Sequence, residues 1–159
     1  FGDKPGAQEV FLALRGLRTL KMRMHHFDSA GRDIATWLSR QPQVKTILHP
    51  AFDSCPGHEN WQRDFSGAAG LFGVVFHPCP EGRIHAFVDA LQHFGIGVSW
   101  GGYESLALPV QPVRTANPWS EPGQLVRFNI GLEDVETLKA DLAAALPLID
   151  TVGAPLDAQ

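Results

Sequence analysis

The chain has 159 residues, 44% of them hydrophobic and 19% charged, and a formal net charge of -4. This length allows one globular domain with a hydrophobic core and is too short for two ordinary domains. The acidic balance argues against a nucleic-acid partner, because the phosphate backbone favours a concentrated basic surface, and the sequence has neither an apolar run of membrane-spanning length nor a recognisable signal peptide. We therefore expect a cytoplasmic protein that binds neither nucleic acid nor membranes.

A single long helix is predicted for the first part of the chain. Apolar residues recur three, four or seven positions apart over residues 8–39, a bend is expected near Gly31, and Pro42 ends the pattern. The sequence starts with Phe1 rather than Met, so its start resembles an interior cut. We expect residues 1–40 to be an interdomain segment with a long first helix that joins this domain to an upstream one.

The next segment is predicted to contain two strands separated by a loop. Residues 44–48 are rich in β-branched side chains and are followed by Pro50. Residues 51–67 contain many Pro, Gly, Asp and Ser residues, which favour a loop with one helical turn near residues 59–63. Residues 69–76 are apolar on both faces, which is typical of a central strand.

A helix and two short strands are predicted next. Glu81 opens the helix, and its apolar stripe continues to Gly95, which is the expected stop. Residues 95–106 are predicted to form a strand, a turn and another strand. Several prolines are expected to hold residues 109–122 in an open loop.

A strand and a last helix complete the predicted domain. Residues 125–130 form an apolar run with the character of a buried strand. Glu133 and Asp134 place negative charge at the N-terminus of the helix, and Pro147 ends it. Residues 151–159 are expected to be a tail.

This order of elements predicts an α/β two-layer domain, in which a small sheet carries helices on one face. The domain is expected to cover residues 41–150.

Two cysteines, Cys55 and Cys79, are too few for a disulfide framework, so we expect both to be reduced. Together with His58 and His77 they have the residue types of a zinc site. Their spacings are irregular, so we expect no bound metal. The remaining histidines are expected to be exposed or hydrogen-bonded.

Two segments contain the residues expected to bind a ligand. In residues 95–106, a glycine-rich turn exposes backbone amides beside Ser99 and Trp100. Arg127 lies inside the apolar run of residues 125–130, where a desolvated guanidinium requires an anionic partner. Because arginine captures carboxylates with paired N–H donors, we expect a carboxylate site formed by Arg127, Ser99 and Trp100.

Each of these residues also has a purely structural interpretation. Arg127 could pair with an internal acid such as Glu104 or Asp134, which is the commoner case for an arginine in a strand. Ser99 and Trp100 could be a turn serine and a core indole. An internal ion pair at Arg127 would leave no place for a ligand carboxylate.

Four ordered blocks of sequence carry a resemblance to a known enzyme family. Their sequences are RGLRTL, PGHENWQRDF, SWGGYESL and RFNIGLED, at residues 15–20, 56–65, 99–106 and 127–134. They resemble the C-terminal domain of cystathionine β-lyases, in the pyridoxal phosphate (PLP) family of cysteine and methionine metabolism. The match extends over roughly residues 15–146.

The resemblance implies the small C-terminal domain of a fold-type I PLP-dependent enzyme, without the large domain that binds the cofactor. It implies that Arg127 binds the α-carboxylate of a sulfur amino-acid substrate, with further donors from Ser99 and from the main-chain amide of Trp100. The full-length enzyme would be a carbon–sulfur lyase of methionine biosynthesis that cleaves L-cystathionine to homocysteine, pyruvate and ammonia, and it would assemble as a tetramer.

The resemblance leaves the reaction of the full-length protein and the role of this chain open. No lysine in the chain has the setting of the family's Schiff-base lysine, so we expect the chain alone neither to bind PLP nor to catalyse. Val98 occupies a position where relatives often carry tyrosine or glutamate, which leaves a cystathionine γ-lyase, a γ-synthase or a methionine γ-lyase as alternatives. A non-catalytic binding or assembly module is an alternative of a different class.

Overall fold

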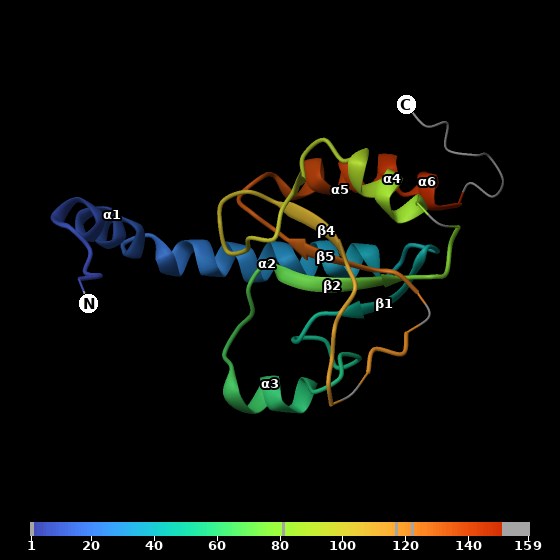
Figure 1. Cartoon of the computed structure of the whole chain (residues 1–159), viewed down its shortest axis with the longest axis horizontal. Coiled ribbons are helices and arrows are strands. Elements are labelled where there is room, and N and C mark those ends of the chain that lie inside the picture. The colour runs from blue at the N-terminus through green and yellow to red at the C-terminus, as the bar shows by residue number, and fades with distance from the viewer. Residues whose placement is uncertain (1, 81, 117, 122, 151–159) are drawn as a thin grey trace.

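The computed structural model describes residues 2–80, 82–116, 118–121 and 123–150. Six helices and five strands lie within these ranges. In chain order they are α1 (Ala7–Leu17), α2 (Leu20–Leu38), β1 (Val44–Leu48), α3 (His58–Asp64), β2 (Leu71–Phe76), α4 (Arg83–Asp89), β3 (Gly95–Ile96), β4 (Leu106–Val110), β5 (Leu125–Asn129), α5 (Val135–Ala145) and α6 (Pro147–Asp150) (Figure 1).

The strands form one mixed sheet in the order β1-β2-β5-β4-β3. All neighbours are antiparallel except β3 and β4, which are parallel. The predicted strand at residues 69–76 corresponds to β2. It lies between β1 and β5, so the prediction of a central strand from its two apolar faces is confirmed. The prediction that residues 125–130 form a strand is also confirmed, since they contain β5.

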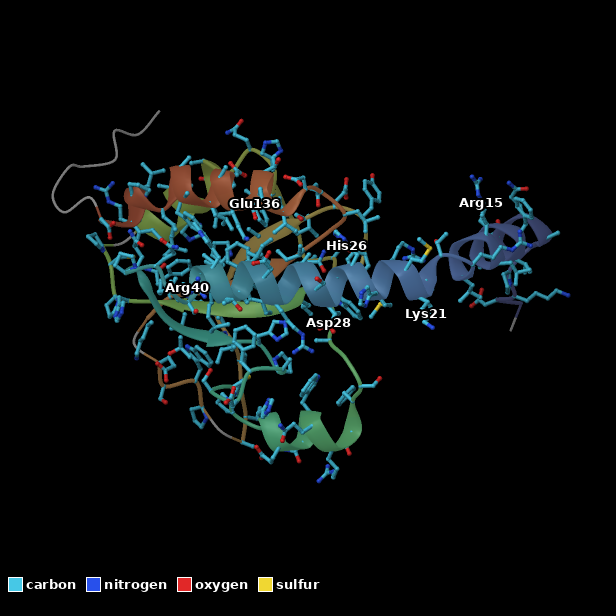
Figure 2. The ribbon with its side chains drawn as sticks, turned by 180° about the vertical axis from the view of Figure 1, so that it is seen from behind. Arg15, Lys21, His26, Asp28, Arg40 and Glu136 are labelled. Carbon is cyan, nitrogen blue, oxygen red and sulfur yellow. The ribbon has the colours of Figure 1, made fainter. Side chains whose placement is uncertain are left out.

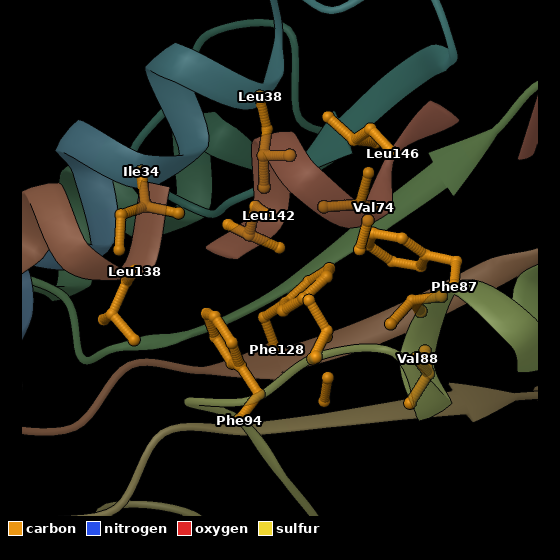
Figure 3. Close-up of a cluster of buried hydrophobic side chains, with 14 of the residues drawn as sticks. Ile34, Leu38, Val74, Phe87, Val88, Phe94, Phe128, Leu138, Leu142 and Leu146 are labelled. Carbon is orange, nitrogen blue, oxygen red and sulfur yellow. The ribbon is translucent and has the colours of Figure 1, made fainter. Parts of the chain in front are cut away.

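The hydrophobic core lies on one face of the sheet. Alternate residues of β2 and β5 face it, because side chains of a strand point to opposite faces in turn. Helices α2, α4 and α5 cover this face, and their apolar side chains pack against Val74 and Phe128 of the sheet (Figure 3). The predicted α/β two-layer class, with a small sheet and helices on one face, is confirmed.

The predicted single helix at residues 8–39 is two helices. The break lies at Arg18 and Thr19, where the Gly16 carbonyl accepts hydrogen bonds from the Thr19 hydroxyl at 3.3 Å and from Arg23 Nη2 at 2.8 Å. Helix α2 continues without interruption through Gly31, where a bend was expected. Gly31 lies inside α2, where a Cβ atom would come within 3.3 Å of the Ala69 carbonyl oxygen and of the Gly70 Cα, so its lack of a side chain serves close packing.

The two N-terminal helices have different environments. Helix α1 contributes no buried residue and extends beyond the sheet, and Figure 2 shows Arg15 on α1 and Lys21 on the first turn of α2. From Phe27 onward, in contrast, α2 places Phe27, Ile34 and Leu38 in the core. Residues 1–40 therefore include both an exposed arm and part of the folded domain.

Within the described residues, no helix combines the length and apolar character needed to cross a bilayer.

Three other predicted boundaries differ from the structure. Helix α4 ends at Asp89 rather than just before Gly95, because the Asp141 carboxylate of α5 accepts hydrogen bonds from the Gln92 and His93 backbone N–H groups and turns the chain away. Pro147 was expected to end the last helix, and α5 does end just before it, at Ala145, but Pro147 also begins the short helix α6, since proline is tolerated in a first helical turn.

Pro109 was expected in the open loop and lies in β4, opposite Val126. Strand β3 pairs only with Leu106 and Ala107, so β4 is an edge strand at Pro109, where proline is tolerated. Glu81, expected to open α4, and residues 151–159, expected to be a tail, lie outside the described residues.

Candidate functional site

Arg127 lies on the face of the sheet opposite the helices. Its neighbours in β5, Val126 and Phe128, are completely buried in the core, so strand alternation directs Arg127 to the other face. There it is paired with Gly73 of β2 and Leu108 of β4. Its side chain is half-buried.

Two main-chain carbonyl groups hold the Arg127 guanidinium. Nη2 donates to the carbonyl oxygen of Gly97 at 3.1 Å and to that of Ser99 at 3.3 Å. Nε and Nη1 have no hydrogen-bond partner in the described part of the chain, and no carboxylate there forms an ion pair with Arg127. The structure thus brings Arg127 and Ser99 together and leaves part of the guanidinium open.

The acids that could have neutralised Arg127 have other roles. Asp134 caps helix α5, accepting from the Thr137 backbone N–H at 2.9 Å, and this hydrogen bond lowers the pKa of Asp134. Glu104 has an exposed side chain, and its carbonyl oxygen accepts a hydrogen bond from Asn129. The internal ion pair considered from the sequence is therefore absent from this part of the described structure.

The residues around the guanidinium are exposed. Trp100 is 63% exposed, so it is not a core indole, and Ser99 is exposed as well. Val98 is 75% exposed beside them. Ile96 and Tyr103 are also large apolar side chains open to solvent on this segment, which is unusual for a free surface and typical of a surface that meets a ligand or another domain.

Asn129 is a residue of this site that the sequence did not single out. It is 2% exposed, and both ends of its amide are used: the Gly101 N–H donates to Oδ1 at 2.9 Å, and Nδ2 donates to the Glu104 carbonyl oxygen at 3.1 Å. The sequence did contain a signal for this role. Asn129 is a polar residue in an apolar strand, and because it follows Arg127 by two positions, both side chains must lie on the same face of the sheet.

Glu133 has a different role from the one predicted. It was expected to place charge at the N-terminus of the last helix, and Asp134 takes that position as the cap. Glu133 instead accepts hydrogen bonds from the backbone N–H and the hydroxyl of Ser105, at 2.8 Å and 2.7 Å. This contact anchors the end of the loop that begins near Gly97.

A groove of about 970 Å³ lies where β4 ends and β5 begins. Leu125, two residues before Arg127 in β5, lines it together with the proline-rich loop after β4. Within this loop the Arg114 guanidinium lies over the Trp119 ring, 5.5 Å from its centroid. Polar side chains of Glu121 and Gln124 also line the groove.

His49 was expected to be exposed or hydrogen-bonded, and it is hydrogen-bonded through only one of its two ring nitrogens. The ring is completely buried between Phe52 and Phe72, and its Nε2 has no partner. Its Nδ1 accepts from the Ala51 backbone N–H at 3.2 Å. Burial, reinforced by the nearby Arg32 charge, lowers the pKa of His49 from 6.5 to about 4.

The cysteine and histidine residues that were considered as zinc ligands do not form a metal site. Cys55 and Cys79 are free thiols, and burial raises the pKa of each. His58 instead lies within hydrogen-bond distance of the Pro50 carbonyl oxygen, at 2.8 Å. The described residues contain no group of three or more His, Cys, Asp and Glu side chains that could hold a metal ion.

Residues 1–147 match the sequence profile of the Cys/Met metabolism PLP-dependent enzymes. The chain belongs to this family. It is 46% identical over 140 residues to a putative cystathionine beta-lyase from Rhizobium johnstonii, a match that covers 84% of this chain and 35% of that protein. It is 40% identical over 154 residues to the cystathionine beta-lyase of Haemophilus influenzae, covering 93% of this chain and 39% of that protein. The family resemblance of the four sequence blocks is confirmed.

The fold is similar to that of a solved member of the family. The crystal structure of cystathionine gamma synthase from Xanthomonas oryzae pv. oryzae in complex with cystathionine matches with a TM-score of 0.74 and 30% identity. The match covers 88% of this chain and 38% of that one. The chain thus spans well under half the length of the relatives compared.

A covalent PLP site requires a lysine placed beside the reacting atoms, and the chain has four lysines. Lys45 pairs with Glu121 at 2.6 Å, and Lys139 pairs with Asp33 at 3.0 Å. The others, Lys4 and Lys21, are exposed in the N-terminal part of the chain. No catalytic step is assigned to these lysines.

Proposed function

We propose that this chain is the C-terminal, substrate-binding domain of a PLP-dependent carbon–sulfur lyase similar to cystathionine β-lyase. The full-length enzyme would cleave L-cystathionine to homocysteine, pyruvate and ammonia in methionine biosynthesis. The observation that carries this proposal is the half-buried Arg127 guanidinium, whose Nε and Nη1 have no partner within the described chain. A carboxylate is the group that such a guanidinium binds best.

The proposed task of the chain is to bind and orient the substrate. The Gly97 and Ser99 carbonyl oxygens fix Nη2, so the rest of the guanidinium is presented in one orientation. Ser99 and the main-chain amide of Trp100 would supply further donors. A substrate held by its α-carboxylate has a fixed Cα–H direction, which favours proton removal by a base elsewhere in the enzyme.

We propose that PLP is held by the part of the enzyme outside this chain. When bound there, PLP would withdraw electrons from the substrate Cα, which is the chemistry that the family requires. The isolated chain should therefore be inactive. If PLP is added to it and a lysine-dependent visible absorbance band appears, this part of the proposal is wrong.

The other proposals about the full-length protein concern its partners and its location. We propose that it forms a homotetramer in the cytoplasm. The rest of the enzyme would make most of the contacts between subunits. The exposed apolar segment from Ile96 to Tyr103 would face the rest of the enzyme and the substrate. Size-exclusion chromatography with light scattering would measure the oligomeric state.

A γ-reaction is the second candidate, since the solved relative with the same fold is a γ-synthase that binds cystathionine. The exposed Val98 beside Ser99 adds to this candidate, because an apolar side chain cannot make polar contacts to the distal part of a substrate. β-Elimination from L-cystathionine gives pyruvate, and γ-elimination gives an oxobutyrate. The two candidates are therefore separated by the keto acid that is formed.

The deciding experiment uses the full-length protein that carries this chain. It is incubated with PLP and L-cystathionine, and the keto acids are separated and quantified. Pyruvate formation that is lost in Arg127→Met supports the proposal, whereas oxobutyrate as the main product favours the γ-reaction. No keto acid from any sulfur amino acid would favour a non-catalytic binding module.

A further inference from the structure

Asn129 is a buried polar residue on the ligand-facing side of the sheet. It follows Arg127 by two positions in β5, so both side chains leave the strand on the same face. Arg127 is half-buried, whereas only 2% of Asn129 is exposed because residues 101–104 cover it. Buried amides need hydrogen-bond partners, and the partners of Asn129 all belong to this covering segment.

The Asn129 amide closes the glycine turn. Oδ1 accepts from the Gly101 N–H at 2.9 Å, and Nδ2 donates to the Glu104 carbonyl oxygen at 3.1 Å. Gly101 has a φ of 74°, a left-handed conformation that favours glycine. A Cβ atom on Gly101 or Gly102 would meet no atom within 4 Å, so packing gives little support to the turn at these positions.

Arg127 contacts the earlier part of the same loop. Its Nη2 is bound by the carbonyl oxygens of Gly97 and Ser99, and Ser99 lies two residues before Gly101. Two alternate residues of one strand thus contact successive parts of one loop: Arg127 contacts residues 97–99, and Asn129 contacts residues 101–104. A shift of the second part would move the carbonyl oxygens that orient the guanidinium.

We propose that Asn129 is a positioning residue of the carboxylate site, which sets the geometry of Arg127 through the loop of residues 97–104 without touching the substrate. This inference rests on the function proposed above. It assigns a specific task to a buried amide whose place in the chain would otherwise suit an apolar side chain.

The test measures KM and kcat for L-cystathionine in the full-length protein. Asn129→Ala should raise KM about tenfold, because two buried hydrogen bonds that fix the loop are lost, and it should change kcat much less. Asn129→Ser, whose hydroxyl can replace one of the two hydrogen bonds, should recover part of the affinity.

Matched variants separate positioning from general stability. Val126→Ala removes core volume from the same strand on the other face, and it should lower the melting temperature without raising KM. Asn60→Ala changes an exposed asparagine on α3 and should alter neither the melting temperature nor KM. If Asn129→Ala behaves like Val126→Ala, with a lower melting temperature and an unchanged KM, the inference is overturned.

A double-mutant cycle tests whether Asn129 acts through Arg127. Asn129→Ala should raise KM far less in an Arg127→Lys background than in the wild-type protein, because the geometry it protects is already lost. Independent, additive effects would overturn the positioning role while the carboxylate site remains. If Arg127→Lys itself leaves KM unchanged, the proposed function fails, and the inference fails with it.

Discussion

Glu133 accepts two hydrogen bonds from Ser105, one from the backbone N–H at 2.8 Å and one from the hydroxyl at 2.7 Å. The Ser105 oxygen accepts in turn from the Gly131 N–H at 2.9 Å. This cluster joins the start of β4 to the turn after β5. It therefore holds the base of the loop that carries Ser99 close to the strand that carries Arg127.

Replacing Glu133 should destabilise the protein. Glu133→Ala removes an ionised acceptor and leaves Ser105 without its partner, so the free energy of unfolding should fall by about 2 kcal/mol. Glu133→Gln keeps one acceptor and should lose about half as much. Urea denaturation followed by tryptophan fluorescence would measure both changes.

The control for this prediction is Glu136→Ala. Glu136 is 78% exposed and pairs with Lys139 on the surface of α5, so its loss should change the unfolding free energy by less than about 0.5 kcal/mol. Equal losses for Glu133→Ala and Glu136→Ala would contradict the anchoring role of Glu133.

Arg127→Lys tests whether the shape of the guanidinium matters in addition to its charge. Lysine keeps the positive charge but lacks the planar arrangement of donors, and it cannot both bind the Gly97 and Ser99 carbonyl oxygens and present paired N–H groups to a carboxylate. We expect kcat/KM for L-cystathionine to fall about 100-fold in the full-length protein, equivalent to about 3 kcal/mol.

Arg63→Lys provides the matched control. Arg63 is 70% exposed and pairs with its neighbour Asp64 on α3, so the same exchange there should leave kcat/KM unchanged. A value for Arg127→Lys within twofold of the wild-type protein would show that the guanidinium does not bind the substrate.

The local signals in the sequence predicted most of the sheet and the approach of Arg127 to Ser99. Apolar runs specify strands directly, and an arginine in such a run implies a polar task on one face. The break at Thr19 was not predictable in the same way, because the apolar period continues through it and the interruption depends on hydrogen bonds to the Gly16 carbonyl group.

The remaining differences come from contacts between distant parts of the chain. The end of α4 depends on Asp141, which lies 49 residues after its hydrogen-bond partner Gln92. The task of Asn129 depends on a loop 25 to 28 residues earlier. Periodicity and propensity describe each segment alone, so they could not specify either contact.

His49 should make stability depend on pH. Its pKa is about 4 in the folded protein and 6.5 in the unfolded chain, because the buried ring resists protonation. Above pH 6.5 neither state binds the proton, and between pH 6.5 and pH 4 only the unfolded chain does. The folded state should therefore lose up to roughly 3 kcal/mol as the pH falls through this window.

His49→Leu should flatten this dependence, since an apolar side chain of similar volume suits the site between Phe52 and Phe72. Urea denaturation at pH 7 and at pH 4.5 gives the comparison. His93→Leu changes an exposed ring and should leave the dependence as it is in the wild-type protein. If the two variants lose stability in parallel on acidification, the buried ring is not the cause.

Two helical glycines should respond in opposite directions to the same substitution. Gly16 lies in the last turn of the exposed helix α1, and outside the helix backbone an added Cβ atom would come no closer than 4.0 Å to its nearest neighbour, the end of the Arg23 side chain. Gly16→Ala should therefore stabilise the protein by about 0.5–1 kcal/mol through helix propensity. Gly31→Ala places a Cβ atom 3.3 Å from the backbone of Ala69 and Gly70.

The backbone at Gly70 cannot move away from Gly31, because a Cβ position on Gly70 already lies within 3.0 Å of the Ile130 backbone nitrogen. The clash should therefore outweigh the gain in propensity, and Gly31→Ala should destabilise the protein by about 1–2 kcal/mol. Thermal unfolding of the two variants would show melting temperatures on opposite sides of the wild-type value. A higher melting temperature for Gly31→Ala would mean that α2 can shift on the sheet, and that the contact at Gly31 does not fix its position.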